Sequence, residues 1–247
     1  MVQNLSFQIS PGETLALVGE SGSGKTLTAL ALLGLLPPHI HLVGGQVEFL
    51  QKRVTLSGEV AFAHLRGKHI AMIFQEPHAA LNPVFRVGTQ IRDVVQTHLG
   101  LRKKAAKNYT AELLSQVGFA EPHAIAKKYP HELSGGMAQR ILIAIALSCN
   151  PQLIIADEPT TALDATSQLH ILKLIENLQI AHRFALLLIS HDIGLVEKLA
   201  DTVVVLKNGK AVEYSSAEQL FHSPTHEYTR ELINACCRRA ASKVKVI

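Results

Sequence analysis

An eight-residue stretch near the start of the chain, Gly19–Thr26, constrains the fold more than any other feature. It reads GESGSGKT and fits the pattern G-x-x-x-x-G-K-[ST]. A short apolar run, Leu15–Gly19, leads into it, and a strong helix-forming segment, Thr26–Leu36, follows and is expected to stop at Pro37–Pro38. Strand, glycine loop and helix in this order predict a β-loop-α unit, and therefore an α/β fold.

The residue types in this loop are those that bind phosphate groups. Glycines let backbone N–H groups converge on a β-phosphate, and the helix that begins there adds the positive end of its dipole. Lys25 supplies a positive charge to the β- and γ-phosphates, and Thr26 offers a hydroxyl group to Mg²⁺. A nucleotide site follows, but kinases, GTPases, motors and transport ATPases all remain open. The predicted nucleotide-binding residues here are Gly19, Glu20, Ser21, Gly22, Ser23, Gly24, Lys25 and Thr26.

Two adjacent acids, Asp157 and Glu158, follow a second apolar run, Leu153–Ala156. An aspartate at the end of a strand can hold Mg²⁺ opposite Thr26, and Glu158 can polarise an attacking water molecule. The alternative interpretation is an ordinary acidic loop after a strand. It is less favoured because the phosphate loop is in the same chain. A base suited to water favours hydrolysis over phosphoryl transfer to a second substrate.

A third motif, Leu133–Arg140 (LSGGMAQR), precedes another helix-forming run. Ser134 is expected to cap that helix, and Gly135 and Gly136 expose backbone N–H groups. The chain would then have a second helix N-terminus able to bind an anion. The alternative is a plain N-cap beside a flexible Gly-Gly pair.

Hydrophobic periodicity divides the rest of the chain. Near-continuous apolar runs of the kind that fill a parallel sheet occur at His69–Phe74, Leu153–Ala156 and Phe184–Ile189. Helical patterns dominate from about Glu76 to Asn150. We therefore predict an α/β fold with a mainly parallel sheet. Residues 1–75 and 150–247 would form a nucleotide-binding core, and residues 76–149 an inserted helical subdomain.

Shorter patterns add detail to this division. Val47–Leu56 is expected to be extended, and Asn208–Gly209 between two strand-like runs predicts an antiparallel hairpin with a tight turn. The tail from Ser216 has a helical pattern. The positions expected on the inward faces of helices are Ile91, Val94, Val95, Leu99, Leu113, Leu114, Val117, Leu169, Leu172, Ile175 and Leu178.

Composition excludes several other classes of protein. Of 247 residues, 47% are hydrophobic and 18% charged, which is enough to fill a sizeable core and argues against disorder. The net charge of +4 is too small to argue for a nucleic-acid partner. There is no apolar run of the length needed to cross a membrane and no signal-peptide pattern, and three cysteines make no disulfide framework. We expect a soluble protein of a reducing compartment with one core.

Together the motifs resemble the ATP-binding cassette family, the ATPase subunits of ABC transporters, from Leu5 to about Arg230. That family has a P-loop NTPase (RecA-like) core with a helical subdomain and antiparallel β elements. Its motifs occur here in the family's order: Walker A at Gly19–Thr26, the Q-loop glutamine at Gln75, the signature at Leu133–Gln139, Walker B at Leu153–Glu158, the D-loop at Ala162–Asp164 and the switch histidine at His191.

The resemblance implies two subunits that pair head to tail around two ATP molecules, with ATP and Mg²⁺ as cofactors. The signature of one subunit would face the nucleotide of the other, with Ser134 and Gly136 at its γ-phosphate. Gln75 would also report nucleotide occupancy to a membrane partner. The implied roles are catalysis for Glu158, His191 and Gln75, Mg²⁺ binding for Thr26, Gln75 and Asp157, and nucleotide binding for Ser134, Gly135, Gly136, Gln139 and Asp164.

Two further segments resemble the peptide/nickel import group within that family. Phe74–Pro83 reads FQEPHAALNP, and Ser223–Arg230 reads SPTHEYTR, where the group has FQDP..SLNP and HPYT. The group implies uptake of peptides or nickel through two membrane permease subunits, with an extracytoplasmic substrate-binding protein, at the cytoplasmic face of the membrane. His226 and Tyr228 could instead be ordinary helix-surface residues.

One feature departs from the family pattern. Members usually stack adenine on an aromatic residue in a strand upstream of Walker A. Phe7 is the only aromatic residue among the 18 before Gly19, and it lies in what looks like the following strand. One explanation is that the chain is truncated, or that its first residue was placed downstream of the true start. The other is that adenine is bound less firmly. No adenine-stacking residue is therefore assigned.

Two other functions and one thiol pair stay open. One alternative function is a soluble ABC ATPase acting on nucleic acid or ribosomes, and the other is a low-activity partner subunit of a heterodimer. No nucleic-acid partner is expected. The adjacent thiols Cys236 and Cys237 are either incidental or part of a metal site, and the first interpretation is favoured because no further ligand stands at metal-site spacing.

Overall fold

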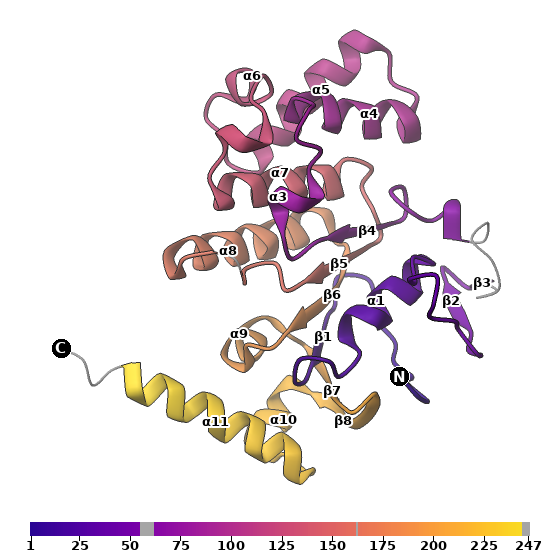
Figure 1. Ribbon diagram of the computed structural model, residues 1–247, viewed down its shortest axis with the longest axis vertical. Helices are drawn as coiled ribbons and strands as arrows, with labels where there is room; N and C mark the ends of the chain where they lie inside the picture. Colours follow the sequence, from indigo (N-terminus) through magenta and orange to yellow (C-terminus); the bar gives the residue numbers. More distant parts are fainter. Residues whose placement is uncertain (55–61, 162, 244–247) are drawn as a thin grey trace. The chain divides into compact units, whose positions relative to one another are not determined.

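The computed structural model describes residues 1–54, 62–161 and 163–243 of the chain (Figure 1). The chain forms two compact units. One comprises Met1–Glu59 together with Ala185–Ile247, and the other comprises Val60–Phe184. The predicted division into a core (1–75 and 150–247) and a helical subdomain (76–149) stays a prediction.

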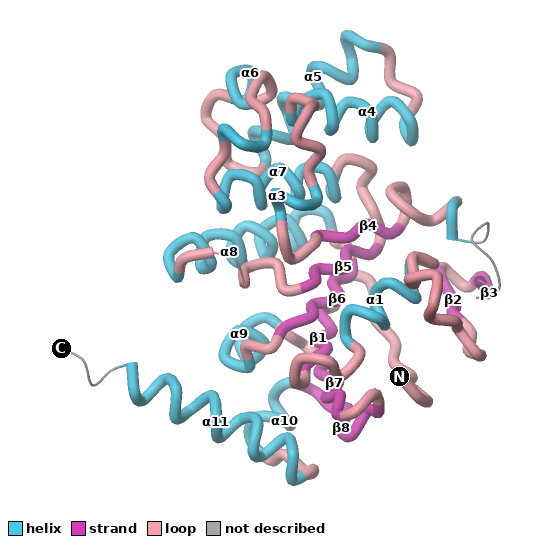
Figure 2. The backbone as a smooth tube through the Cα atoms, in the orientation of Figure 1, coloured by secondary structure: helices cyan, strands magenta, loops and turns pink. Residues whose placement is uncertain are grey.

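The first unit is built on strands that lie in the order β6-β1-β7-β8 (Figure 2). β1 runs parallel to both β6 and β7, while β8 pairs antiparallel with β7. Every residue of β1 and β6 is buried, as expected of apolar strands covered on both faces. These four strands are β1 (Thr14–Val18), β6 (Ala185–Ser190), β7 (Thr202–Lys207) and β8 (Lys210–Ser216).

The helix after the phosphate loop, α1 (Lys25–Leu33), ends earlier than the prolines predict. Gly34 adopts a left-handed conformation with φ 64°, and its N–H donates to the carbonyl oxygen of Ala31. The N–H of Leu35 turns back to the carbonyl oxygen of Leu30. Because glycine adopts a left-handed conformation without steric cost, Gly34 ends the helix three residues before Pro37.

Both hairpins of the first unit turn through two residues with positive φ. Asn208 (φ 51°) and Gly209 (φ 79°) join β7 to β8, which confirms the predicted tight turn. Val47–Leu56 is not one extended segment, because β2 (Val47–Phe49) and β3 (Lys52–Val54) form an antiparallel hairpin. Its turn uses Leu50 and Gln51, which carry no hairpin signal, and residues 55 and 56 lie outside the described residues.

Three helices complete the first unit: α9 (Ile193–Leu199), α10 (Ala217–His222) and α11 (Glu227–Lys243). They form an apolar cluster with β1 and β7 that includes Val18, Val196, Val205, Leu220 and Tyr228. Tyr228 is only 3% exposed, so the alternative that it lies on the helix surface is wrong.

The second unit has a parallel pair, β4 (Ile70–Ile73) and β5 (Leu153–Asp157), with a long helical segment between them in sequence (Figure 1). α7 supplies much of the unit's buried apolar surface. The helices are α3 (Pro77–Ala80), α4 (Val87–Leu99), α5 (Lys103–Gln116), α6 (Pro122–Ile125), η1 (Pro130–Glu132), α7 (Gly135–Leu147) and α8 (Ala165–His182).

The predicted inward faces are mostly confirmed, but Val94 and Leu172 are only half-buried and two other positions are exposed. Ile91, Val95, Leu113, Leu114 and Val117 are buried, whereas Leu99 at the end of α4 is 39% exposed. On α8 the buried stripe is Ile171, Ile175 and Leu178, and Leu169 is 63% exposed. Leu169 stands two residues before Ile171 and therefore about 200° around the helix from it.

Two remaining expectations concern single features. Phe7 lies outside β1, which begins at Thr14, so its predicted place in a strand is wrong. Among the described residues, no helix combines the length and apolar character that crossing a membrane requires.

Candidate nucleotide site

The phosphate loop joins β1 to α1 in the first unit, as predicted. Gly19, Gly22 and Gly24 all have positive φ values, which the curl of the loop requires. Lys25 is 6% exposed, and its ammonium group donates hydrogen bonds of 2.8 Å to the carbonyl oxygens of Gly19 and Glu20. The loop is therefore wrapped around the lysine that the motif assigns to phosphate binding.

Gly19→Ala is expected to lower the free energy of unfolding by about 2 kcal/mol. Gly19 has φ 150°, and an added Cβ would lie 2.2 Å from the backbone oxygen of Leu206, which cannot move independently of β7. Denaturant unfolding of the purified chain measures the effect. Gly22→Ala is the control, since its φ of 81° carries strain of about 1 kcal/mol but an added Cβ meets nothing within 4 Å. Equal losses in the two variants would contradict the steric argument.

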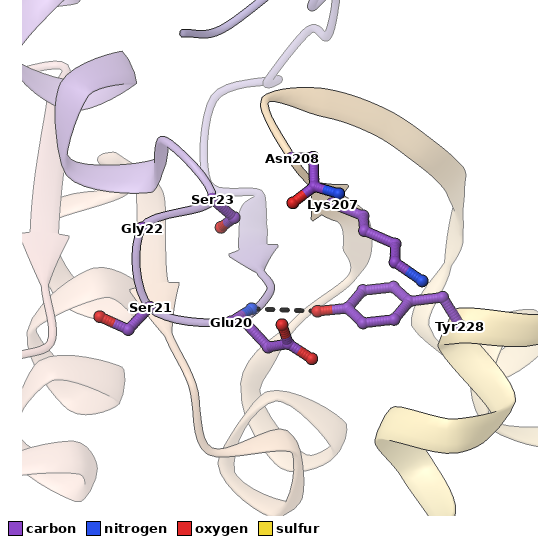
Figure 3. A pocket seen from close by; sticks show the side chains of 7 residues that line it. All are labelled: Glu20, Ser21, Gly22, Ser23, Lys207, Asn208 and Tyr228. Atoms are coloured by element: carbon purple, nitrogen blue, oxygen red, sulfur yellow. Dashed lines mark hydrogen bonds between the residues drawn. The ribbon is translucent and has the colours of Figure 1, made fainter.

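A small cavity of about 60 Å³ lies against the loop (Figure 3). The hydroxyl of Tyr228 accepts a hydrogen bond of 3.1 Å from the backbone N–H of Glu20. The Oγ of Ser23 is buried and has no hydrogen-bond partner among the described residues. Sequence reasoning missed the part that Lys207, Asn208 and Tyr228 take here, because the only signals were a turn dipeptide and a C-terminal motif. The lining residues are Glu20, Ser21, Gly22, Ser23, Lys207, Asn208 and Tyr228.

His191 emerges from the sheet beside this loop. β6 ends at Ser190, which is in register with Val18 at the end of β1. Because the two strands are parallel, His191 and Gly19 leave the same edge of the sheet. The next residue, Asp192, caps α9 by accepting hydrogen bonds from the N–H groups of Gly194 and Leu195, which fixes the chain after the histidine.

The acidic pair lies at the end of β5 in the second unit. Asp157 is 4% exposed, and Glu158 follows in a left-handed conformation with φ 46°, an uncommon one for a residue other than glycine. Oε2 of Glu158 accepts hydrogen bonds from Nε2 of Gln75 (3.0 Å) and Oγ1 of Thr161 (2.9 Å). The structure thus brings together Gln75 and Glu158, which are 83 positions apart, and adds Thr161, which no sequence signal indicated.

The signature segment begins α7 in the way its residues predict. Ser134 is the N-cap, and its hydroxyl oxygen accepts a 3.3 Å hydrogen bond from the N–H of Met137. Gln139 is 1% exposed, and its Nε2 has no hydrogen-bond partner in the described part of the chain. The roles of Ser134, Gly135, Gly136 and Gln139 toward a partner's nucleotide stay predictions.

Asp164 of the D-loop caps α8, while Ala162 lies outside the described residues. Its carboxylate accepts hydrogen bonds from the N–H groups of Thr166 (3.1 Å) and Ser167 (3.0 Å). The Ser167 hydroxyl and then these backbone groups lower the pKa of Asp164. The cap carboxylate is therefore charged at neutral pH, at the end of a helix where negative charge is favourable.

The residues assigned to Mg²⁺ offer the right type of donor. Thr26 in the first unit carries a hydroxyl oxygen, and Asp157 and Gln75 in the second carry carboxylate and amide oxygens. Mg²⁺ prefers such oxygen ligands and usually keeps several waters as well. Each of these residue types suits the ion that accompanies ATP, and the roles of the three residues toward it stay predictions.

Comparison with known proteins decides the family. A family model described as ABC transporter matches residues 2–161, more than half of the chain. The chain belongs to the ABC transporter family. The glutathione import ATP-binding protein GsiA of Escherichia coli O1:K1 / APEC is 49% identical to this ABC protein over 248 residues, which cover 98% of the chain and 40% of GsiA. The chain thus spans about two fifths of the length of that relative.

A second relative and one solved structure agree with this assignment. The oligopeptide transport ATP-binding protein AppD of Bacillus subtilis (strain 168) is 46% identical over 235 residues, covering 95% of this ABC protein and 72% of AppD. A dimeric ATP-binding cassette, MJ0796, bound to ADP and Pi in a post-hydrolysis state, superposes with a TM-score of 0.76 at 25% identity, covering 87% of this chain and 90% of that one. The predicted P-loop NTPase fold and the resemblance to the peptide import group are both confirmed.

Proposed function

We propose that this chain is the ATP-hydrolysing subunit of an ABC importer that takes up peptides through separate membrane subunits, at the cytoplasmic face of the membrane. The observation that carries the proposal is the geometry at the end of β5, where Glu158 follows the buried Asp157 and accepts a hydrogen bond from Gln75. GsiA and AppD are named for glutathione import and oligopeptide transport. Those names support a peptide cargo rather than nickel.

Each motif residue then has a chemical task. Lys25 and the start of α1 bind the β- and γ-phosphates of ATP. Thr26, Gln75 and Asp157 would hold Mg²⁺, which would supply positive charge to the same phosphates. Glu158 accepts a proton from the attacking water as general base. His191, at the edge of the sheet that carries the phosphate loop, positions the γ-phosphate and the water.

A second ATPase subunit completes the site in this proposal. The dimeric state of the MJ0796 cassette supports pairing, and the N–H groups of Gly135 and Gly136, in the first turn of α7, are suited to the γ-phosphate of a partner's ATP. When two copies pair head to tail, the start of α1 binds the phosphates of the subunit's own ATP, and the start of α7 binds the γ-phosphate of its partner's ATP.

Gly136→Ala separates this role from folding. An added Cβ would lie 3.6 and 3.7 Å from atoms of Ser167, which is ordinary contact, and alanine is favoured over glycine in a helix. We expect the unfolding temperature to stay level or rise while ATP-dependent dimerisation falls, as measured by calorimetry and gel filtration. Gly194→Ala is the matched control, because it also lies near a helix start with contacts of 3.5 and 3.7 Å. If Gly136→Ala formed the ATP-dependent dimer as well as the wild type does, the signature would not lie at the dimer interface.

The proposed function is tested by purifying the tagged chain from membranes and identifying the proteins that come with it. We expect two permease subunits and an ATPase partner, and phosphate release from Mg-ATP that rises when a peptide-loaded binding protein is added. The transport proposal would be overturned if the chain were recovered without membrane subunits and if RNA or DNA stimulated its ATPase activity. That stimulation would be expected to fall steeply as the salt concentration rises.

A further inference from the structure

We propose that Tyr228 is a positioning residue for the phosphate loop, through which the start of the C-terminal helix α11 sets the affinity of the chain for ATP. The inference rests on the proposed ATPase function. This role would explain the segment Ser223–Arg230, to which the proposed hydrolysis of ATP assigns no task.

Glu20 is held on both sides of its backbone. Its N–H donates to the hydroxyl of Tyr228 at 3.1 Å (Figure 3). Its carbonyl oxygen accepts a hydrogen bond from the ammonium group of Lys25 at 2.8 Å. The carbonyl oxygen of Gly19 accepts a second bond from the same ammonium group. Tyr228 therefore acts one residue away from the contacts that orient the phosphate-binding lysine.

The tyrosine ring is itself fixed in place. It is 3% exposed within the apolar cluster that contains Val18 and Val205, and the ammonium group of Lys207 lies 4.4 Å from the ring centroid. The positive charge of the Lys207 ammonium group is attracted to the face of the Tyr228 ring, and the surrounding apolar side chains restrict rotation of the ring. The hydroxyl is thus presented to the loop by a rigid support.

The chain before Tyr228 is anchored to β8 by Glu213, which is 9% exposed. Its carboxylate accepts hydrogen bonds from the N–H (2.8 Å) and hydroxyl (2.9 Å) of Thr225 and from the N–H of His226 (3.0 Å). Nδ1 of His226 in turn accepts a bond from the N–H of Tyr228 at 3.1 Å. Burial raises the pKa of Glu213, but hydrogen bonds, first among them the one from the N–H of Thr225, outweigh that effect. The pKa is therefore lowered, and the carboxylate stays charged at neutral pH.

Tyr228→Phe tests the inference, because it keeps the ring and removes only the hydroxyl. We expect the Kd and KM for Mg-ATP to rise about fivefold, the effect of one lost neutral hydrogen bond, with kcat nearly unchanged. Titration calorimetry and steady-state phosphate release on the full chain measure these values. Amide hydrogen exchange over residues 19–26 is expected to accelerate. Tyr214→Phe on β8 is the matched control, since that tyrosine is 46% exposed.

A packing role alone predicts a different result, in which Tyr228→Phe lowers the unfolding temperature but leaves Kd and loop exchange at wild-type values. That outcome would overturn the inference. Glu213→Gln provides a second variant, expected to raise Kd in the same direction by loosening the anchor of Thr225 and His226. A wild-type chain that binds Mg-ATP without releasing phosphate would defeat the proposed hydrolysis, while the Kd and exchange comparisons would still decide the role of Tyr228.

Discussion

Glu158→Gln is expected to lower the rate of ATP hydrolysis by about two to four orders of magnitude, the usual contribution of a general base. The amide cannot accept the proton of the attacking water. The surrounding geometry should persist, because both neighbours, Gln75 and Thr161, donate to the same oxygen, Oε2 of Glu158. A glutamine that places its carbonyl oxygen there still accepts both hydrogen bonds.

The variant should therefore bind Mg-ATP and accumulate as an ATP-dependent dimer, because closure no longer leads to hydrolysis. Phosphate release measures turnover, and gel filtration with and without ATP measures the dimer. Glu176→Gln, on the exposed side of α8, makes the same chemical change away from the site. A folded Glu158→Gln chain that hydrolyses ATP at the wild-type rate, or stays monomeric with ATP, would show the proposed mechanism to be wrong.

Glu158 also shows why much of the candidate site could be proposed from the sequence. The motif residues of the phosphate loop, the acidic pair and the signature are adjacent in the chain, so their spacing is enough to predict them. Parallel strands then bring their carboxyl ends to one edge. Ile73 pairs with Ala156, which brings Gln75 close to Glu158. The same rule, applied to β1 and β6, places His191 at the edge that carries the phosphate loop.

Contacts between distant segments had no such signal. The hydrogen bond between Tyr228 and Glu20 joins positions 208 apart, and the pattern around Tyr228 is equally compatible with a surface helix. The turn at Leu50 and Gln51 was missed because its left-handed residues are neither glycine nor asparagine. Leu169 was assigned to the wrong face because apolar residues occur all around α8, and only packing decides which of them is buried.

Lys25→Met is expected to weaken Mg-ATP binding by about a hundredfold, because it removes a charged hydrogen-bond donor from the phosphates. Methionine keeps the unbranched apolar stem, so the volume at this 6% exposed position is nearly conserved. The carbonyl oxygens of Gly19 and Glu20 each lose a donor, so the loop also loses the group around which it is wrapped. The loss of affinity should therefore exceed that of Tyr228→Phe, which acts on Glu20 alone.

Calorimetric titration with Mg-ATP and Mg-ADP measures this difference, with unfolding temperature as the check on folding. Lys210→Met, at the exposed start of β8, removes the same charge from the surface and should bind both nucleotides as the wild type does. Both nucleotides should be weakened by Lys25→Met, because the ammonium group reaches the β-phosphate that they share. If the folded variant loses affinity for ATP alone, the lysine contacts only the γ-phosphate, and wild-type affinity for both would place phosphate binding elsewhere on the chain.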